Sequence, residues 1–214
     1  MRMTAVQLLL WSVAGPLLFL AALYGQLLYR FTVPPAADIS VPAWPASVPP
    51  AERQQLLAAR LTLLDRFKLL LAGRAGLEQL QQLLTEDCRF EDPTQLLIGR
   101  EEIALLLLDL SPRYVEDIEF EVHAVHHAPH LLLVDWTLNI QTKVFGLNLA
   151  LPMRTHLYLE GEGGGEQVFR IKEEWWGKEL LNPRTTLRVL GDLHNQLRRF
   201  NGYLLVKGIQ SGYV

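Results

Sequence analysis

Hydrophobic residues follow two periods along this chain, and the change between them separates helix-forming from strand-forming segments. Over residues 51–72 the apolar residues recur at steps of three and four, as Leu57, Leu61, Leu64, Phe67 and Leu71. This spacing is typical of a helix with one buried stripe. Shorter helices are expected at residues 77–84 and 100–110, the second ended by Ser111-Pro112. A short strand is expected between them at residues 88–91.

After residue 117 the apolar period changes to two, which is typical of strands with one buried face. Strands are expected at residues 118–124 and 131–143, followed by a connection at residues 145–149. Two further strands at residues 151–160 and 167–175 flank a glycine-rich turn. On the second of the four, one face carries Leu132, Val134, Trp136, Leu138 and Ile140. Helices followed by long antiparallel strands indicate an α+β fold.

The N-terminus carries a long uncharged run, residues 3–29. About 20 apolar residues span a bilayer, so the run predicts a single-pass anchor in contact with membrane lipid. A cleaved signal peptide and a buried soluble helix are the alternatives, but the run exceeds a signal peptide's apolar region and lacks a clear cleavage site. Arg2 and Arg30 flank it evenly, so the sequence predicts a membrane location without orientation or compartment.

The next segment, residues 31–50, contains six prolines and predicts a semi-rigid spacer. At the other end, a long amphipathic helix is expected from Pro183 to about Val206. Its apolar residues again follow at steps of three or four, as Leu187, Leu190, Leu193, Leu197, Phe200 and Leu204. Residues 183–214 carry five basic side chains against one acidic side chain. Such a helix packs either on its own domain or on an anionic membrane surface.

Composition excludes several classes of protein. The net charge of −3 gives no basic field for nucleic acid. The single cysteine, Cys88, cannot form an intrachain disulfide, and its place in a predicted strand favours a buried residue over a reactive thiol. No phosphate-binding loop, dinucleotide fingerprint or serine-hydrolase elbow occurs, and no cofactor is expected.

The segment from Leu84 to Pro93, which reads LTEDCRFEDP, together with Gly99-Arg100-Glu101-Glu102-Ile103, carries a family resemblance. The chain here resembles the nuclear transport factor 2-like superfamily, which includes ketosteroid isomerases and SnoaL-like cyclases. The resemblance implies a cone-shaped α+β fold with a pocket. The expected organisation is an anchor at 1–30, the spacer at 31–50, the domain at 51–178 and a basic helix and tail at 179–214.

Asp92 is the candidate catalytic residue. The resemblance implies that an Asp-Pro pair at this point carries the general base of ketosteroid isomerases, and Asp92-Pro93 matches it. A carboxylate in an apolar cone has a raised pKa, which suits proton transfer near neutral pH. However, residues 65–69 lack the tyrosine that donates to the oxyanion in those enzymes. The alternative is that Asp92 only shapes a turn.

Four further residues are candidates for lining the pocket. Arg154, His156 and Tyr158 share one face of a predicted strand, and Trp136 on the neighbouring strand is a candidate pocket wall. If that face points outward, these residues form a surface or a dimer contact instead. The histidines His123, His126, His127 and His130 surround a turn, but strand geometry separates them, so no metal site is expected.

We therefore expect a membrane-anchored, non-catalytic binding or scaffold module that holds a small apolar ligand or a protein partner. A homodimer through the sheet face is a further possibility that the resemblance implies. The competing hypothesis is an isomerase, cyclase or dehydratase that acts on a lipophilic substrate with Asp92 as its base.

Overall fold

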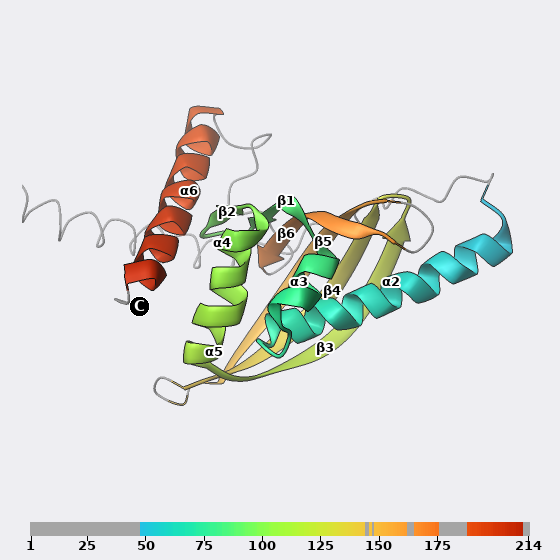
Figure 1. The fold of residues 1–214 in the computed structure, drawn as a ribbon, viewed down its shortest axis with the longest axis horizontal. Helices are drawn as coiled ribbons and strands as arrows, with labels where there is room; N and C mark the ends of the chain where they lie inside the picture. The colour runs from blue at the N-terminus through green and yellow to red at the C-terminus, as the bar shows by residue number, and fades with distance from the viewer. Residues whose placement is uncertain (1–47, 144–145, 147, 162–164, 176–187, 212–214) are drawn as a thin grey trace, which may run out of the picture. The chain divides into compact units, whose positions relative to one another are not determined.

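The structure, a computed structural model, describes residues 48–143, 146, 148–161, 165–175 and 188–211 (Figure 1). The predicted anchor lies outside the described residues, as do most of the spacer and the predicted domain boundary at residue 178. Among the helices in the described ranges, none is long and apolar enough to cross a membrane. The anchor therefore stays a prediction from sequence.

The helical segments lie before, between and after the strands in the sequence. They are α2 (Pro50–Leu71), α3 (Leu77–Leu83), α4 (Arg100–Ala104), the π-helical η1 (Leu105–Leu110), α5 (Ser111–Tyr114) and α6 (Arg188–Ser211). The prediction that Ser111-Pro112 ends a helix is wrong, because the chain stays helical through Tyr114. Pro112 directly follows the π-helical turn η1, where the regular hydrogen-bond pattern of an α-helix is already interrupted.

Six strands form one mixed sheet. They are β1 (Leu84–Glu91), β2 (Leu96–Ile98), β3 (Val115–Ala128), β4 (Leu131–Thr142), β5 (Asn148–Glu160) and β6 (Gln167–Trp175). Their order is β2-β1-β6-β5-β4-β3, and only β1 and β6 pair in parallel. This arrangement confirms the α+β class. The sequence did not predict β2, and β5 begins within the predicted connection at residues 145–149.

The register shifts at several points in the sheet. Shifts occur between β1 and β6, between β5 and β6, and twice between β3 and β4. Such irregularities bend strands and increase their twist, which agrees with a curved sheet. One shift lies between Val122 and Ala124, and Val122 is exposed, contrary to the simple alternation predicted for β3.

Helices α2 and α3 cover one face of the sheet and complete the core (Figure 1). The buried apolar side chains of α2 are Leu63, Leu64, Phe67, Leu70 and Leu71. The predicted stripe is partly wrong, because Leu61 is 48 % exposed and its neighbour Arg60 is 1 % exposed. On the sheet, Leu132, Leu157 and Ile171 pair across β4, β5 and β6 and are fully buried.

Helix α6 packs on the domain beside β2 and η1. Arg199 forms an ion pair with Glu102, and the side chain of Asn201 donates to the carbonyl of Thr94 at 3.0 Å. Val206 and Ile209 are buried. The face of α6 that carries these residues therefore packs on the domain, which is one of the two alternatives predicted for this helix.

The Cys88 thiol is fully buried in β1, as expected from the sequence. Burial raises its pKa to about 12, with further contributions from the carboxylates of Asp87 and Glu160. Because the thiolate is the reactive form, the folded protein should not react with an aromatic disulfide reagent at pH 8. Stoichiometric reaction should occur only after denaturation. Rapid reaction of the native protein would contradict this prediction.

Candidate functional site

Asp92 immediately follows β1, and its carboxylate is held by its own turn. Oδ1 accepts hydrogen bonds from the backbone N–H of Thr94 at 2.6 Å, from the Thr94 hydroxyl at 2.9 Å and from the backbone N–H of Gln95 at 2.7 Å. Oδ2 accepts from the Gln95 side-chain amide at 2.8 Å. This is the pattern by which aspartate stabilises a turn two residues ahead. Asp92-Pro93 therefore closes the β1–β2 connection.

Two effects oppose each other at the Asp92 carboxyl group. Its side chain is buried, and burial raises its pKa above the usual value of 3.8. The four hydrogen bonds from Thr94 and Gln95 favour the charged form and lower the pKa, but they do not cancel the effect of burial. The raised pKa would suit a general base, but the carboxylate oxygens already accept hydrogen bonds from the turn.

Glu173 lies beside Asp92 and is the residue that the sequence analysis missed. Strands β1 and β6 pair Glu91 with Lys172, and Asp92 and Glu173 are the residues that follow; the charge of Asp92 acts on Glu173. Glu173 is 9 % exposed, and its carboxyl group is buried beside the side chain of Trp175. Burial and the negative charge of Asp92 raise the pKa of Glu173 to about 8, although a side-chain hydrogen bond with Trp175 lowers it. Glu173 is therefore mainly protonated at neutral pH.

A signal for Glu173 exists in the sequence. The alternation of β6 places Ile171, Glu173 and Trp175 on one face, and the other two are apolar. A charged residue in a row of apolar residues indicates a buried, perturbed group. Together, Asp92 and Glu173 form a buried pair in which one carboxyl group can donate a proton and the other can accept it.

Trp136 contributes to the packed core. Its indole N–H donates to the Thr155 hydroxyl at 3.1 Å, and its ring lies against Phe67 and Phe120, with centroids 6.2 Å and 5.3 Å away. Trp136 pairs with Met153 on β5, on the face of the sheet that α2 covers. Aromatic side chains fill the space around it.

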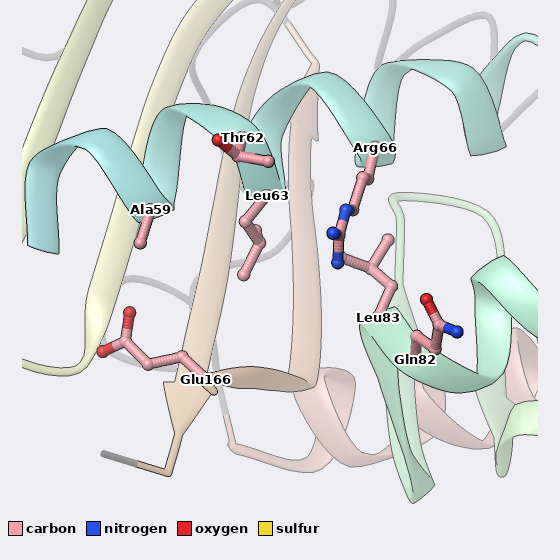
Figure 2. Close-up of a pocket in the computed structure, with 7 residues that line it drawn as sticks. All are labelled: Ala59, Thr62, Leu63, Arg66, Gln82, Leu83 and Glu166. Atoms are coloured by element: carbon pink, nitrogen blue, oxygen red, sulfur yellow. The ribbon is translucent and has the colours of Figure 1, made fainter. Parts of the chain in front are cut away.

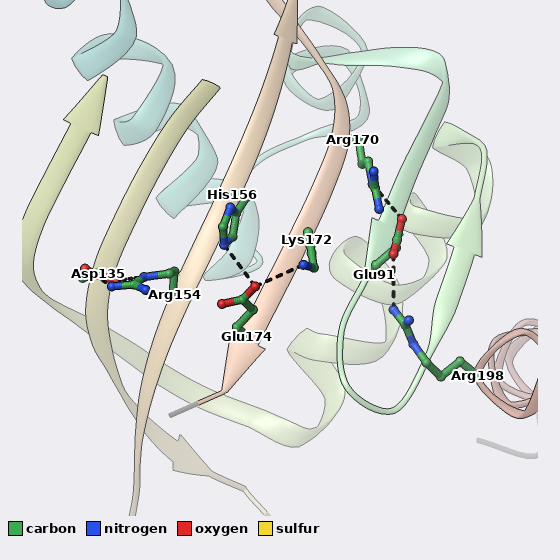
Figure 3. Close-up of polar contacts among 8 residues, drawn as sticks. All are labelled: Glu91, Asp135, Arg154, His156, Arg170, Lys172, Glu174 and Arg198. Carbon is green, nitrogen blue, oxygen red and sulfur yellow. Dashed lines mark hydrogen bonds and ion pairs between the residues drawn. The ribbon is translucent and has the colours of Figure 1, made fainter. Parts of the chain in front are cut away.

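The other three predicted pocket residues lie on the opposite face of the sheet. Because Trp136 pairs with Met153, the neighbouring Arg154 points the other way, as do His156 and Tyr158. They belong to the polar network in Figure 3 or stack on it. The structure therefore does not bring Trp136 and these three residues together. On the opposite face His156 is buried, and Arg154 and Tyr158 are partly buried.

The network on this face consists of ion pairs between strands, and Figure 3 also shows the pair that Glu91 forms with Arg198 of α6. Arg154 binds Asp135 with two hydrogen bonds, of 2.6 and 2.9 Å. Glu174 lies 3.3 Å from His156 Nε2 and 3.1 Å from Lys172 Nζ. Burial raises the pKa of Glu174, but these two partners outweigh it and hold the pKa at about 2. The ion pairs join β4, β5 and β6.

Two of the cavities in the protein are lined by described residues. One, of about 200 Å³, lies between α2, the end of α3 and Glu166, and Figure 2 shows its lining residues, among them Thr62 and Arg66. The other, of about 380 Å³, lies at the ends of β3, β4 and β5. Small-molecule pockets usually measure about 300–1,000 Å³. Neither of these two cavities is lined by Asp92 or Trp136.

The histidines around the β3–β4 turn remain separate. His123 contacts the Thr137 hydroxyl at 2.8 Å, and His126 and His127 are consecutive residues of β3. Burial lowers the pKa of His127, and the charges of Arg60 and His126 lower it further. Within the described part of the chain, no group of histidine, cysteine or acidic residues is arranged to hold a metal ion.

Comparison with known families agrees with this fold. The model of the SnoaL-like domain matches residues 67–171, which run from α2 into β6. None of the curated proteins compared with the chain matches it. The family model and the fold together support a SnoaL-like, nuclear transport factor 2-like domain in this part of the chain.

Solved structures give the same result. A nuclear transport factor 2-like protein from Anabaena variabilis is 15 % identical with a TM-score of 0.50, over 64 % of this chain and all of that one. A type 2 hexachlorocyclohexane dehydrochlorinase is 10 % identical with a TM-score of 0.51, over 58 % of this chain and 88 % of that one. At these identities the likeness establishes the fold alone.

Proposed function

We propose that this chain is a membrane-anchored, non-catalytic binding module whose SnoaL-like domain holds an apolar ligand or a protein partner. The proposal rests on the hydrogen bonds that Thr94 and Gln95, in the turn after Asp92, donate to its carboxylate. A general base must reach the proton that it removes, and this carboxylate already accepts four hydrogen bonds from Thr94 and Gln95. The membrane attachment rests on the uncharged run at residues 3–29.

The packing around Trp136 also supports binding without turnover. Phe67 and Phe120 lie against its indole, and Thr155 takes its only N–H. The Trp136 indole is therefore engaged within the core and is not free to act as an oxyanion donor, the kind of group that usually supplies the largest catalytic effect.

A second candidate function is acid–base catalysis on a lipophilic substrate. The observation that favours it is Glu173, a buried acid near Asp92 whose pKa is raised to about 8. In this scheme Glu173 would donate a proton and Asp92 would accept one. A substrate would first have to displace the Gln95 amide from Asp92.

An experiment on the Asp92→Asn variant separates the two functions. The full-length parent and the variant would be purified in mild detergent, and any retained small molecules would be extracted and identified by mass spectrometry. A binding module should retain the same molecule in both proteins, or none in either, with similar thermal stability, because asparagine keeps the oxygen that accepts from Thr94 and Gln95. A molecule that accumulates only in the variant would indicate a blocked turnover and overturn the proposal.

A further inference from the structure

Helix α6 is fixed on the domain by one face. A Cβ atom added to Gly202 would lie 2.5 Å from the backbone oxygen of Leu96, so the helix backbone approaches β2 more closely than any side chain would permit. Asn201 and Arg199 add hydrogen bonds to the carbonyls of Thr94 and Leu96. The rotation of the helix about its own axis is therefore determined.

The opposite face of α6 carries large apolar side chains that the domain does not cover. We call this set the outward row; its members are Leu197 (45 % exposed), Phe200 (55 %), Tyr203 (50 %) and Leu204 (49 %). Leu197, Phe200 and Leu204 follow at steps of three and four. The sequence repeats that spacing upstream with Leu190 and Leu193, within the same helical segment.

The spacing of the outward row favours a second helix as its binding partner. Alternating steps of three and four form the narrow seam by which two helices pair, whereas a helix on a membrane needs a wide apolar face bordered by basic residues. The basic residues described near the row face the domain instead, since Arg198 and Arg199 pair with Glu91 and Glu102. Lys207, which lies over the Tyr203 ring, is the cation at the end of the row.

We propose that the outward row is a self-association surface, on which α6 of a second copy of this chain packs as an antiparallel or parallel helix pair. Four half-exposed side chains would bury about 400 Å² on each copy, since large aromatic side chains bury about 150–250 Å² each. This is below the roughly 800 Å² per partner of a standard interface. The pair is therefore a weak, concentration-dependent dimer, unless the leucines upstream extend it.

Disulfide trapping tests this surface directly, because the only native cysteine, Cys88, is buried. Cysteine would be introduced at Leu197, Phe200 or Leu204 of the full-length chain, one at a time, in detergent with far more micelles than protein. Gln54→Cys, at an exposed position of α2, serves as the control for random collision. We expect at least one variant of the row to form several-fold more disulfide-linked dimer than Gln54→Cys under mild oxidation.

A second substitution checks that the dimer is specific. Phe200→Glu, combined with Leu197→Cys or with Leu204→Cys, should reduce trapping to the Gln54→Cys level. It should leave the thermal transition of the protein unchanged, because Phe200 is 55 % exposed. Trapping at or below the control level in all three row variants would overturn the proposal. So would a fluorophore on Phe200→Cys that is quenched by lipid-borne quenchers in nanodiscs, since lipid would then be the occupant. Neither result would affect the function proposed for the SnoaL-like domain.

Discussion

Replacing Arg60 by methionine is expected to lower the free energy of unfolding by about 3–5 kcal/mol, the usual cost of leaving one partner of a buried ion pair without the other. Arg60 Nε and Nη2 bind both carboxylate oxygens of Glu166, at 2.8 and 2.7 Å. The same guanidinium donates to the backbone carbonyls of Ala128 and Pro129. One side chain of α2 thus joins the β3–β4 turn to the start of β6. Urea unfolding followed by tryptophan fluorescence measures the loss.

The matched control for this prediction is Arg66→Met on the same helix. Arg66 is exposed at the rim of the 200 Å³ cavity, so its replacement should change stability by less than about 0.5 kcal/mol. The double variant Arg60→Met/Glu166→Leu should recover part of the loss, because it removes the stranded carboxylate as well. If Arg60→Met proved no more costly than Arg66→Met, the central role of this ion pair would be refuted.

The phase of α2 shows what sequence periodicity can and cannot predict. The steps of three and four correctly predicted a helix and the burial of Leu64, Phe67 and Leu71. They also placed Leu61 inside and gave no role to Arg60, because leucines occur on most sides of this helix. Arg60 can be buried because it pairs with Glu166, 106 residues away, and no local pattern contains that information.

The sheet likewise shows which features of the candidate site could be predicted from the sequence and which could not. Alternation within a strand correctly indicated which residues share a face, so Arg154, His156 and Tyr158 do lie together. The register between strands depends on turns and bulges, and the pairing of Trp136 with Met153 put the indole on the other face. The position of Asp92 after β1 was predictable from Asp-Pro. Its neighbour Glu173 was not, because it comes from the parallel pairing of strands far apart in sequence.

The Glu173→Gln variant should be more stable than the parent at pH 8.5 and equally stable near pH 4.5. The folded protein raises the pKa of Glu173 from 4.5 to about 8, so folding favours the protonated form. The contribution of Glu173 to the free energy of unfolding is fully present below pH 4.5. It is lost as the pH rises toward 8, by up to about 1.4 kcal/mol per pH unit. Glutamine cannot ionise and avoids that loss. Urea unfolding at half-unit intervals from pH 4.5 to 8.5 measures the difference.

Glu174→Gln is the matched control, one residue away on the opposite face, and its effect should have the opposite sign. His156 and Lys172 lower the pKa of Glu174 to about 2, so its contribution is present above pH 4.5 and is lost as the pH falls toward 2. Glu174→Gln should therefore be less stable than the parent at neutral pH, and the gap should close on acidification. Parallel pH profiles for both variants and the parent would show that neither carboxylate has the environment described. Opposite slopes would identify Glu173 as the acid that the inner face holds protonated, whether or not that proton takes part in chemistry.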